Sequence, residues 1–116
     1  MCLLSYFPTL FSDHTGVKYF INVPNVGSYQ KSNLEDLRET LVILLAANYD
    51  DIIVSGVENG CVIVTFMMRN YLIPFLKALF KSEERIIFQK ILEMKIFKVI
   101  IQDDIVYIRG TFLHKD

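Results

Sequence analysis

The sequence predicts a single α+β domain built around an antiparallel sheet. Apolar residues alternate along residues 17–23, leucines recur at helical spacing after residue 34, and an Asn-Gly pair separates two strongly apolar runs. The length of 116 residues is that of one domain. Apolar residues make up 53% of the chain and charged residues 22%, which excludes intrinsic disorder.

The first half of the chain predicts a strand followed by a helix. Apolar residues occupy every second position of residues 17–23, as in a half-buried strand, and a loop rich in turn-forming residues follows over 24–29. Ser32 and Glu35 have the spacing of a capping box, in which each side chain accepts a hydrogen bond from a free amide. Leucines at helical spacing then predict a helix to about Ala47.

Residues 52–58 and 61–67 are predicted to form a β-hairpin. Only Asn59-Gly60 separates the two runs, and this pair tolerates the positive φ angles of a type I′ turn. The second run is apolar at almost every position. That pattern is typical of a central strand that is covered on both faces, or covered on one face by a partner.

Two short helices are predicted next. Asn70 is a candidate N-cap with Pro74 in the first turn, and Ser82-Glu83-Glu84 starts a second helix, because acidic residues favour the positive end of a helix dipole. The apolar face of the second helix is expected at Ile86, Ile87, Ile91 and Met94.

A second hairpin is predicted at the end of the chain, with strands at 97–101 and 105–109 around an Asp103-Asp104 turn. Without its last strand, the order is β-α-β-β-α-β, the ferredoxin-like arrangement of an antiparallel sheet with both helices on one face. We therefore expect one domain over residues 17–113, with an extra C-terminal strand, preceded by an N-terminal extension over residues 1–16.

The cysteine content predicts a reduced, cytoplasmic setting, because a secreted domain of this size normally carries several disulfides. There are two cysteines, Cys2 and Cys61. The apolar start of the chain lacks a basic region and is interrupted by Pro8, so no signal peptide is expected. No apolar run approaches the roughly 20 residues of a spanning helix, so no membrane interaction is expected.

Catalysis is not expected, and neither is a metal or cofactor. The two histidines, His14 and His114, lie near opposite ends of the chain, and Cys61 lies in a strand where a free cysteine usually behaves as a small apolar residue. The acidic pairs at 50–51 and 103–104 are typical of solvated turns. The cysteines and histidines lack paired metal-ligand spacing, and the glycines are too scattered for a phosphate-binding loop.

Nucleic-acid binding is not expected either, although the RNA recognition motif shares the β-α-β-β-α-β order. Its third-strand signature would fall on residues 59–66, where Gly60, Val64 and Phe66 match. Cys61 and Ile63 stand in place of the aromatic residues that stack on bases. The net charge of −1 also gives no general attraction for phosphate.

More apolar residues are present than a four-stranded domain needs. Exposed aromatic and methionine side chains usually mark a partner surface, but the apolar N-terminal extension could equally pack across an open face of the sheet. We predict a partner interface at residues that line the strands and the segment after the first hairpin, some of which could instead be core. They are Val62, Val64, Phe66, Met68, Tyr71, Tyr107 and Phe112.

Three segments resemble a known family: the helix at 37–45, the hairpin VENGCVIVTF at 57–66 and the closing IFKVIIQDDIVY at 96–107. They are similar to small α+β domains of animal innate-immune and cell-death signalling proteins, such as the N-terminal domain of the TNF-receptor death-domain adaptor. Residues 67–70 depart from the aliphatic-Pro step that follows the hairpin in that family. The resemblance implies a non-catalytic adaptor and no catalytic residues.

We therefore expect a protein-protein interaction module that associates with itself, as a homo-oligomer, or with a like domain, by an exposed sheet face or edge strand. Its setting, by resemblance, is innate-immune or cell-death signalling. The alternative is an ACT-like regulatory domain that binds a small ligand, since such domains share this topology. An amino acid that raised the melting temperature would favour the alternative.

Overall fold

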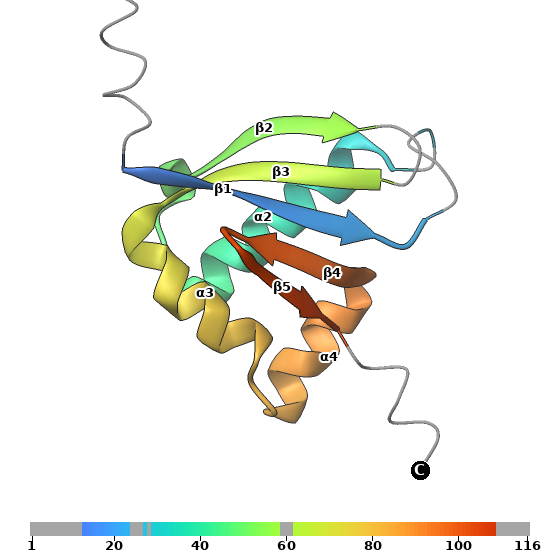
Figure 1. Cartoon of the computed structure of the whole chain (residues 1–116). Helices are drawn as coiled ribbons and strands as arrows, with labels where there is room; N and C mark the ends of the chain where they lie inside the picture. The colour runs from blue at the N-terminus through green and yellow to red at the C-terminus, as the bar shows by residue number, and fades with distance from the viewer. Residues whose placement is uncertain (1–12, 24–26, 28, 59–61, 109–116) are drawn as a thin grey trace, which may run out of the picture.

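The structure is a computed structural model that describes residues 13–23, 27, 29–58 and 62–108. In this part of the chain, five antiparallel strands form one sheet in the order β2-β3-β1-β4-β5, with three α-helices (Figure 1). The predicted α+β class is confirmed. The strands are β1 (His14–Ile21), β2 (Ile52–Glu58), β3 (Val62–Arg69), β4 (Ile96–Ile101) and β5 (Asp104–Tyr107), and the helices are α2 (Lys31–Leu45), α3 (Ile73–Phe80) and α4 (Arg85–Glu93).

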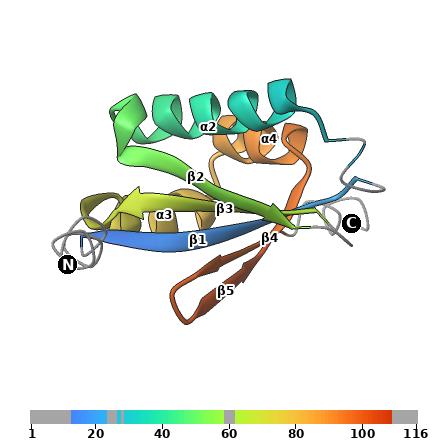
Figure 2. The same cartoon turned by 90° about the horizontal axis from the view of Figure 1, so that it is seen from above.

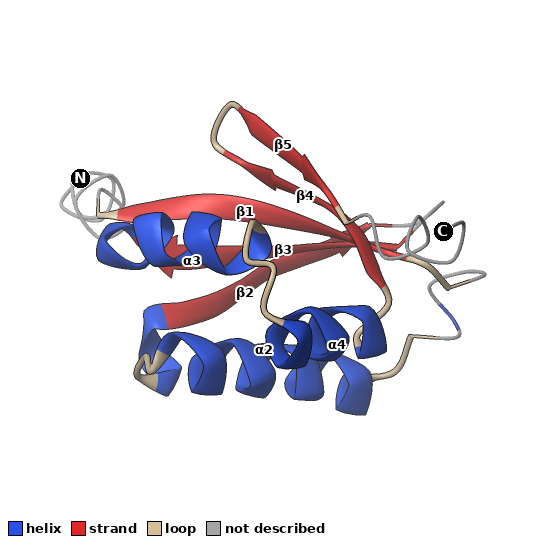
Figure 3. Ribbon diagram, turned by 90° about the horizontal axis from the view of Figure 1, so that it is seen from below, coloured by secondary structure: helices blue, strands red, loops and turns tan. Residues whose placement is uncertain are grey.

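The three helices cover the same face of the sheet, and none of the described residues forms a helix on the opposite face (Figures 2 and 3). Side chains that alternate along β1 and β3 fill the core between the two layers, because successive residues of a strand point to opposite faces. Val17, Tyr19 and Ile21 supply the core side of β1. Leu37, Leu41, Leu72, Leu76 and Ile91 are among the fully buried residues that meet them from the helical layer.

The β2–β3 hairpin is confirmed, with both strands near their predicted positions. β3 lies inside the sheet, paired with β2 on one side and with β1 on the other. The pairing with β2 shifts its register between Val54 and Gly56, as in a β-bulge. The Asn59-Gly60 turn lies outside the described residues.

Helix α2 starts earlier than the predicted capping box. Gln30 is the N-cap, and the Oδ1 atom of Asn33 accepts a hydrogen bond from the Gln30 backbone N–H at 2.9 Å. The reciprocal pattern expected at Ser32 and Glu35 is therefore displaced by two residues, and an amide side chain takes the place of the carboxylate. The helix ends at Ala46, which has a left-handed φ of 53°.

The segment after β3 also begins differently from the prediction. Asn70 opens a short 3-10 turn, Asn70–Leu72, so it does not cap α3 directly. Pro74 lies in the first turn of α3, as predicted. The predicted start of α4 is confirmed, and the Glu84 backbone N–H donates to the Ser82 Oγ at 3.1 Å.

The β4–β5 hairpin is confirmed, with its turn one residue earlier than predicted. The turn residues are Gln102 and Asp103, and Gln102 takes the left-handed φ of 56° that a tight turn needs. At the other end of the sheet, β1 begins at His14, so the sheet includes residues that were assigned to the extension. Residues 1–12 lie outside the described part.

Candidate functional site

Four of the predicted interface residues lie in the core. Val62, Val64, Phe66 and Met68 alternate along β3, are fully buried and face the helical layer. Phe66 packs against the Tyr19 ring with a centroid distance of 5.5 Å. The sequence indicated which residues share a face of the strand and left open whether they are core or interface, and the structure places these four in the core under the helices.

The other predicted interface residues have different surroundings. Tyr71 lies in the 3-10 turn before α3 and Tyr107 lies on β5, and both are exposed. The interface is therefore not one contiguous set along β3. Phe112 lies outside the described residues.

Tyr71 belongs to a polar network at the start of β2. Its hydroxyl donates to the carboxylate of Asp51, which is only 7% exposed, and Arg69 Nε lies 3.5 Å from Asp51 Oδ1. Arg69 also pairs with Asp13. The hydrogen bond to Asp51 raises the pKa of the Tyr71 phenol above its ordinary value. This network joins the ends of β1, β2 and β3, which points to a structural role.

The uncovered face of the sheet carries an aromatic cluster around Lys98. The Lys98 Nζ lies 4.2 Å from the centroid of the Phe20 ring and 5.8 Å from that of Tyr107. Phe97 meets Phe20 edge to face at 6.1 Å. We call Phe20, Phe97, Lys98 and Tyr107 the Lys98 cluster. It spans β1, β4 and β5, so it makes the β5 side of the open face apolar.

β5 forms an edge of the sheet and, within the described residues, pairs only with β4. Ile105 and Tyr107 point to the open face and are 54% and 55% exposed. The pairing with β4 is regular, and the Ile108 backbone N–H donates to the Phe97 carbonyl at 3.0 Å. Hydrogen-bonded pairs alternate along antiparallel strands, so the backbone groups of Ile105 and Tyr107 point away from β4.

A groove runs beside β5 on its other face, towards the connection between α3 and α4. Its volume is about 720 Å³. Phe80, Phe88, Val106 and Ile108 supply apolar walls, and Lys81 and Glu83 add charges. β4 pairs with β1 along its length, and β5 follows at the edge of the sheet. The β5 edge therefore combines outward-pointing backbone groups, which have no strand partner among the described residues, with exposed apolar side chains and a groove.

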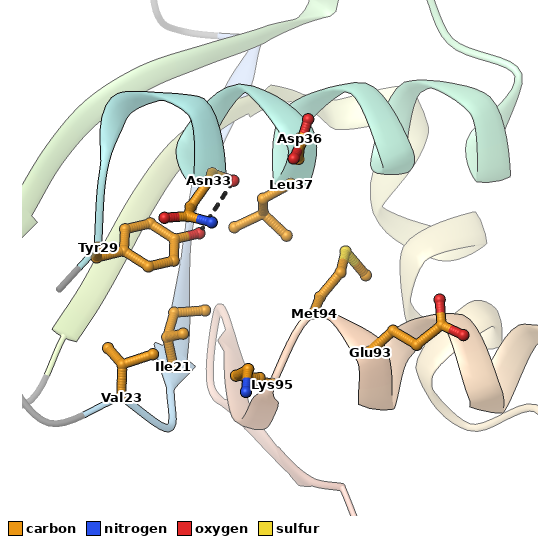
Figure 4. Close-up of a pocket in the computed structure, with 9 residues that line it drawn as sticks. All are labelled: Ile21, Val23, Tyr29, Asn33, Asp36, Leu37, Glu93, Met94 and Lys95. Carbon is orange, nitrogen blue, oxygen red and sulfur yellow. Dashed lines mark hydrogen bonds between the residues drawn. The ribbon is translucent and has the colours of Figure 1, made fainter.

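A separate pocket of about 350 Å³ lies between the end of β1, the start of α2 and the α4–β4 corner (Figure 4). Ile21, Leu37 and Met94 form apolar walls, and Asp36, Glu93 and Lys95 contribute charges. Such a pocket offers apolar contact together with ionic groups of both signs.

Tyr29 is the half-buried polar group of this pocket. Its hydroxyl donates to the Asn33 carbonyl at 3.4 Å. Burial, with the negative charge of Asp36, raises the pKa of Tyr29 to about 12. The phenol is therefore neutral at physiological pH.

A candidate metal site is not found among the residues that the structure describes. These residues contain no group of three or more His, Cys, Asp or Glu side chains placed to hold a metal ion. His14 Nδ1 lies 2.9 Å from Asp13 Oδ1. Cys61 and His114 lie outside the described residues, so the structure does not show whether they are close together.

No helix in residues 13–23, 27, 29–58 and 62–108 is both long enough and apolar enough to cross a membrane.

Sequence reasoning missed Phe20, Phe97 and Ile105 as surface residues. For Phe20 and Ile105 the available signal was the alternation itself, since these positions are out of phase with the buried ones in their strands. Phe97 shares the parity of the buried Val99 and Ile101, and its exposure coincides with the register shift in the β1–β4 pairing, which alternation alone does not show. The sequence did not show on which face of the sheet the helices pack, and that face decides which residues are exposed.

Comparisons with protein-family models, with curated proteins and with solved structures found no match.

Proposed function

We propose that this protein is a non-catalytic protein-protein interaction module that docks by its β5 edge. The supporting observation is the coincidence at β5 of outward backbone groups, exposed Ile105 and Tyr107, and the adjoining groove. Strand addition at a sheet edge uses these elements, because main-chain hydrogen bonds supply affinity and side-chain pockets supply specificity.

The two sides of β5 would have different parts in binding. An added strand would continue the open face next to Ile105 and Tyr107, and every second side chain would point towards the groove beside Val106. The apolar walls at Phe80 and Phe88 favour an apolar side chain there. The partner is therefore an extended segment with alternating apolar residues, either in a second copy or in a like domain.

We also propose that the topology is ferredoxin-like with one added strand. Read from the β5 edge, the strand order is β5-β4-β1-β3-β2, and β1 separates β3 from β4, the strands that flank α3 and α4. Removal of β5 leaves four strands with helices in the two crossover positions, which supports this assignment.

We propose an adaptor role in innate-immune or cell-death signalling in the cytoplasm on the sequence resemblance. The hairpin VENGCVIVTF and the closing segment IFKVIIQDDIVY carry it. β5 provides the regular edge at which such an adaptor would associate.

A photo-crosslinking amino acid at position 107 tests the interaction role. Because Tyr107 lies at the proposed edge, irradiation of cells that express the variant is expected to yield discrete crosslinked protein products. The matched control places the same amino acid at Ile86, which is an exposed apolar residue of α4. Products at position 107 and not at 86 would support the proposal, whereas equal or absent products would contradict it.

One observation favours the ACT-like alternative, namely the pocket shown in Figure 4. Asp36 and Lys95 place charges of opposite sign at a pocket with apolar walls, as the ammonium, carboxylate and side chain of an amino acid would require. A ligand selective for the native state raises the melting temperature. A panel of amino acids is expected to shift the melting temperature of the wild type and not of Asp36→Asn if this function is correct, and a flat panel would remove it.

A further inference from the structure

We infer that the partner of β5 is the β5 strand of a second copy, paired antiparallel with Ile105 opposite Tyr107 and with Val106 on the two-fold axis. This inference rests on the proposed function. It specifies that the partner is a second copy, and it specifies which residues of the two β5 strands lie opposite each other.

The backbone of β5 selects this register. The hydrogen bond from the Ile108 N–H to Phe97, together with the regular alternation, directs the backbone groups of Ile105 and Tyr107 outward. When Ile105 of one copy lies opposite Tyr107 of the other, both residues of each pair exchange an N–H···O bond. All four outward donors and acceptors of the two residues on each copy are then used. A shift by two residues in one direction would place Tyr107 opposite Asp103 in the turn and leave part of this set unpaired. The opposite shift would place Tyr107 opposite itself and Ile105 opposite residue 109, which lies outside the described residues.

The side chains of β5 agree with the same register. Opposite residues of an antiparallel pair lie on one face, so each Ile105 would meet a Tyr107 on the open face. Pairs of aromatic and β-branched residues stabilise antiparallel strands relative to alanine pairs. Val106 would meet its own copy beside the two grooves, which it helps to line.

Charge favours the antiparallel arrangement. Asp103 and Asp104 lie at the turn end of β5, and Lys77 Nζ is 3.4 Å from Asp104 Oδ2. Antiparallel pairing places the two acidic turns at opposite ends of the interface. Parallel pairing would bring like charges side by side, which is destabilising.

The other edge of the sheet is less suited to pairing. β2 carries the register shift between Val54 and Gly56, and β-bulges interrupt the ladder and twist an edge strand away from partners. β5 has no such shift. A second copy is therefore expected at β5 and not at β2.

Cysteine crosslinking tests the register. In a Cys2→Ser, Cys61→Ser background, Val106→Cys would lie opposite itself in a non-hydrogen-bonded pair, with Cα atoms about 4.5 Å apart, within disulfide range. Ile105→Cys would lie roughly 8 Å from its own copy, beyond that range. We expect a covalent dimer from Val106→Cys under mild oxidation, and little from Ile105→Cys or from Tyr107→Cys alone.

A mixed experiment supplies the matched control. Differently tagged Ile105→Cys and Tyr107→Cys chains are expected to crosslink with each other several-fold more than either does with itself. Equal self-crosslinking of Ile105→Cys and Val106→Cys would overturn the register. Circular dichroism of the Cys2→Ser, Cys61→Ser chain checks that it folds. Light scattering of the wild-type chain over a hundredfold concentration range measures its oligomeric state without any cysteine replacement.

The failures of the inference and of the proposed function are distinguishable. A strictly monomeric wild type that still forms crosslinks to another protein from position 107 would overturn the second copy as partner and leave the interaction role in place. A monomer without any crosslinked protein would overturn both.

Discussion

The β2–β3 and β4–β5 hairpins differ in how they relate to the rest of the molecule. β3 lies inside the sheet between β2 and β1, and every second side chain is fully buried under the helices. β5 lies at the edge, contributes the half-buried Val106 to the core, and exposes Ile105 and Tyr107. The β2–β3 pairing is interrupted by a bulge, whereas the β4–β5 pairing is regular.

This difference indicates that the two hairpins serve different purposes, although both are pairs of short apolar strands that follow one another in the chain. The first hairpin supplies the core and is expected to determine stability. The second contributes Ile96, Val99 and Ile101 of β4 to the core, but its strand β5 lies at the edge and is expected to determine association. The predictions below test this division with matched substitutions.

Phe66→Ala in β3 is expected to have the largest effect on stability. Phe66 is fully buried and packs on Tyr19, so its truncation leaves a cavity and is expected to cost about 3–5 kcal/mol of unfolding free energy. Phe97→Ala in β4 is the matched change in the other hairpin. Phe97 is 40% exposed and meets Phe20 edge to face, so a cost of about 1 kcal/mol is expected. Equal costs in urea unfolding would refute the division.

Asp51→Asn, at the start of β2, is expected to cost about 1–3 kcal/mol, because a buried group loses charge-assisted hydrogen bonds. Its carboxylate accepts from the Tyr71 hydroxyl and from the Asn48 backbone N–H, and pairs with Arg69. Asp104→Asn removes the exposed pair with Lys77 and should change stability by less than about 0.5 kcal/mol. Chemical denaturation of the two variants would compare them directly, and an equal loss would count against a special role for Asp51.

Alkaline pH is expected to weaken the helix-covered half of the molecule. Burial raises the pKa of Tyr19 well above its ordinary value, and burial with the Asp36 charge raises that of Tyr29 to about 12. The phenols ionise first in the unfolded chain, so stability is complete below about pH 10 and falls as pH rises towards 12. For Tyr29 the loss is on the order of 1 kcal/mol per pH unit in this window.

The check is the urea midpoint of the wild type and of Tyr29→Phe across this pH range. Tyr29→Phe removes one ionisable phenol and should flatten part of the decline. A decline of the same size in the variant would show that Tyr29 does not contribute.

Gly56→Ala, at the bulge of the first hairpin, is expected to have the smallest effect and to be stabilising. A Cβ atom built there has no heavy atom within 4 Å, so the substitution restricts the unfolded chain by about 0.4–1 kcal/mol without a clash. Gly16→Ala should gain less, because its Cβ would lie 3.4 Å from Met67 Sδ. A loss of stability in the thermal unfolding of Gly56→Ala would show that the bulge requires glycine.

The periodicity of the sequence predicted much of the fold. Alternation located β1, and turn residues located both hairpins, because these are local signals. Helix α2 was placed within a few residues, although its cap uses Gln30 and Asn33 instead of Ser32 and Glu35. Amide side chains can serve as caps, so several adjacent polar residues are plausible starts of one helix.

The sequence was less informative about the candidate site. β3 is apolar on both faces, with Ile63 and Met67 on one side and Val64 and Phe66 on the other. Nothing local distinguishes the two faces, because burial depends on where distant helices pack. The edge position of β5 likewise depends on the order of strands, which follows from pairings between segments far apart in the chain.

The bulge between Val54 and Gly56 has a consequence for growth. A sheet with two equally regular edges can add copies at both ends without limit, and so becomes a template for fibres. Here the regular edge is at β5, and an isologous contact through it uses that edge on both copies. The dimer would then have the bulged strand β2 at each end of its sheet. The one-residue bulge would therefore stop further copies from adding to the sheet.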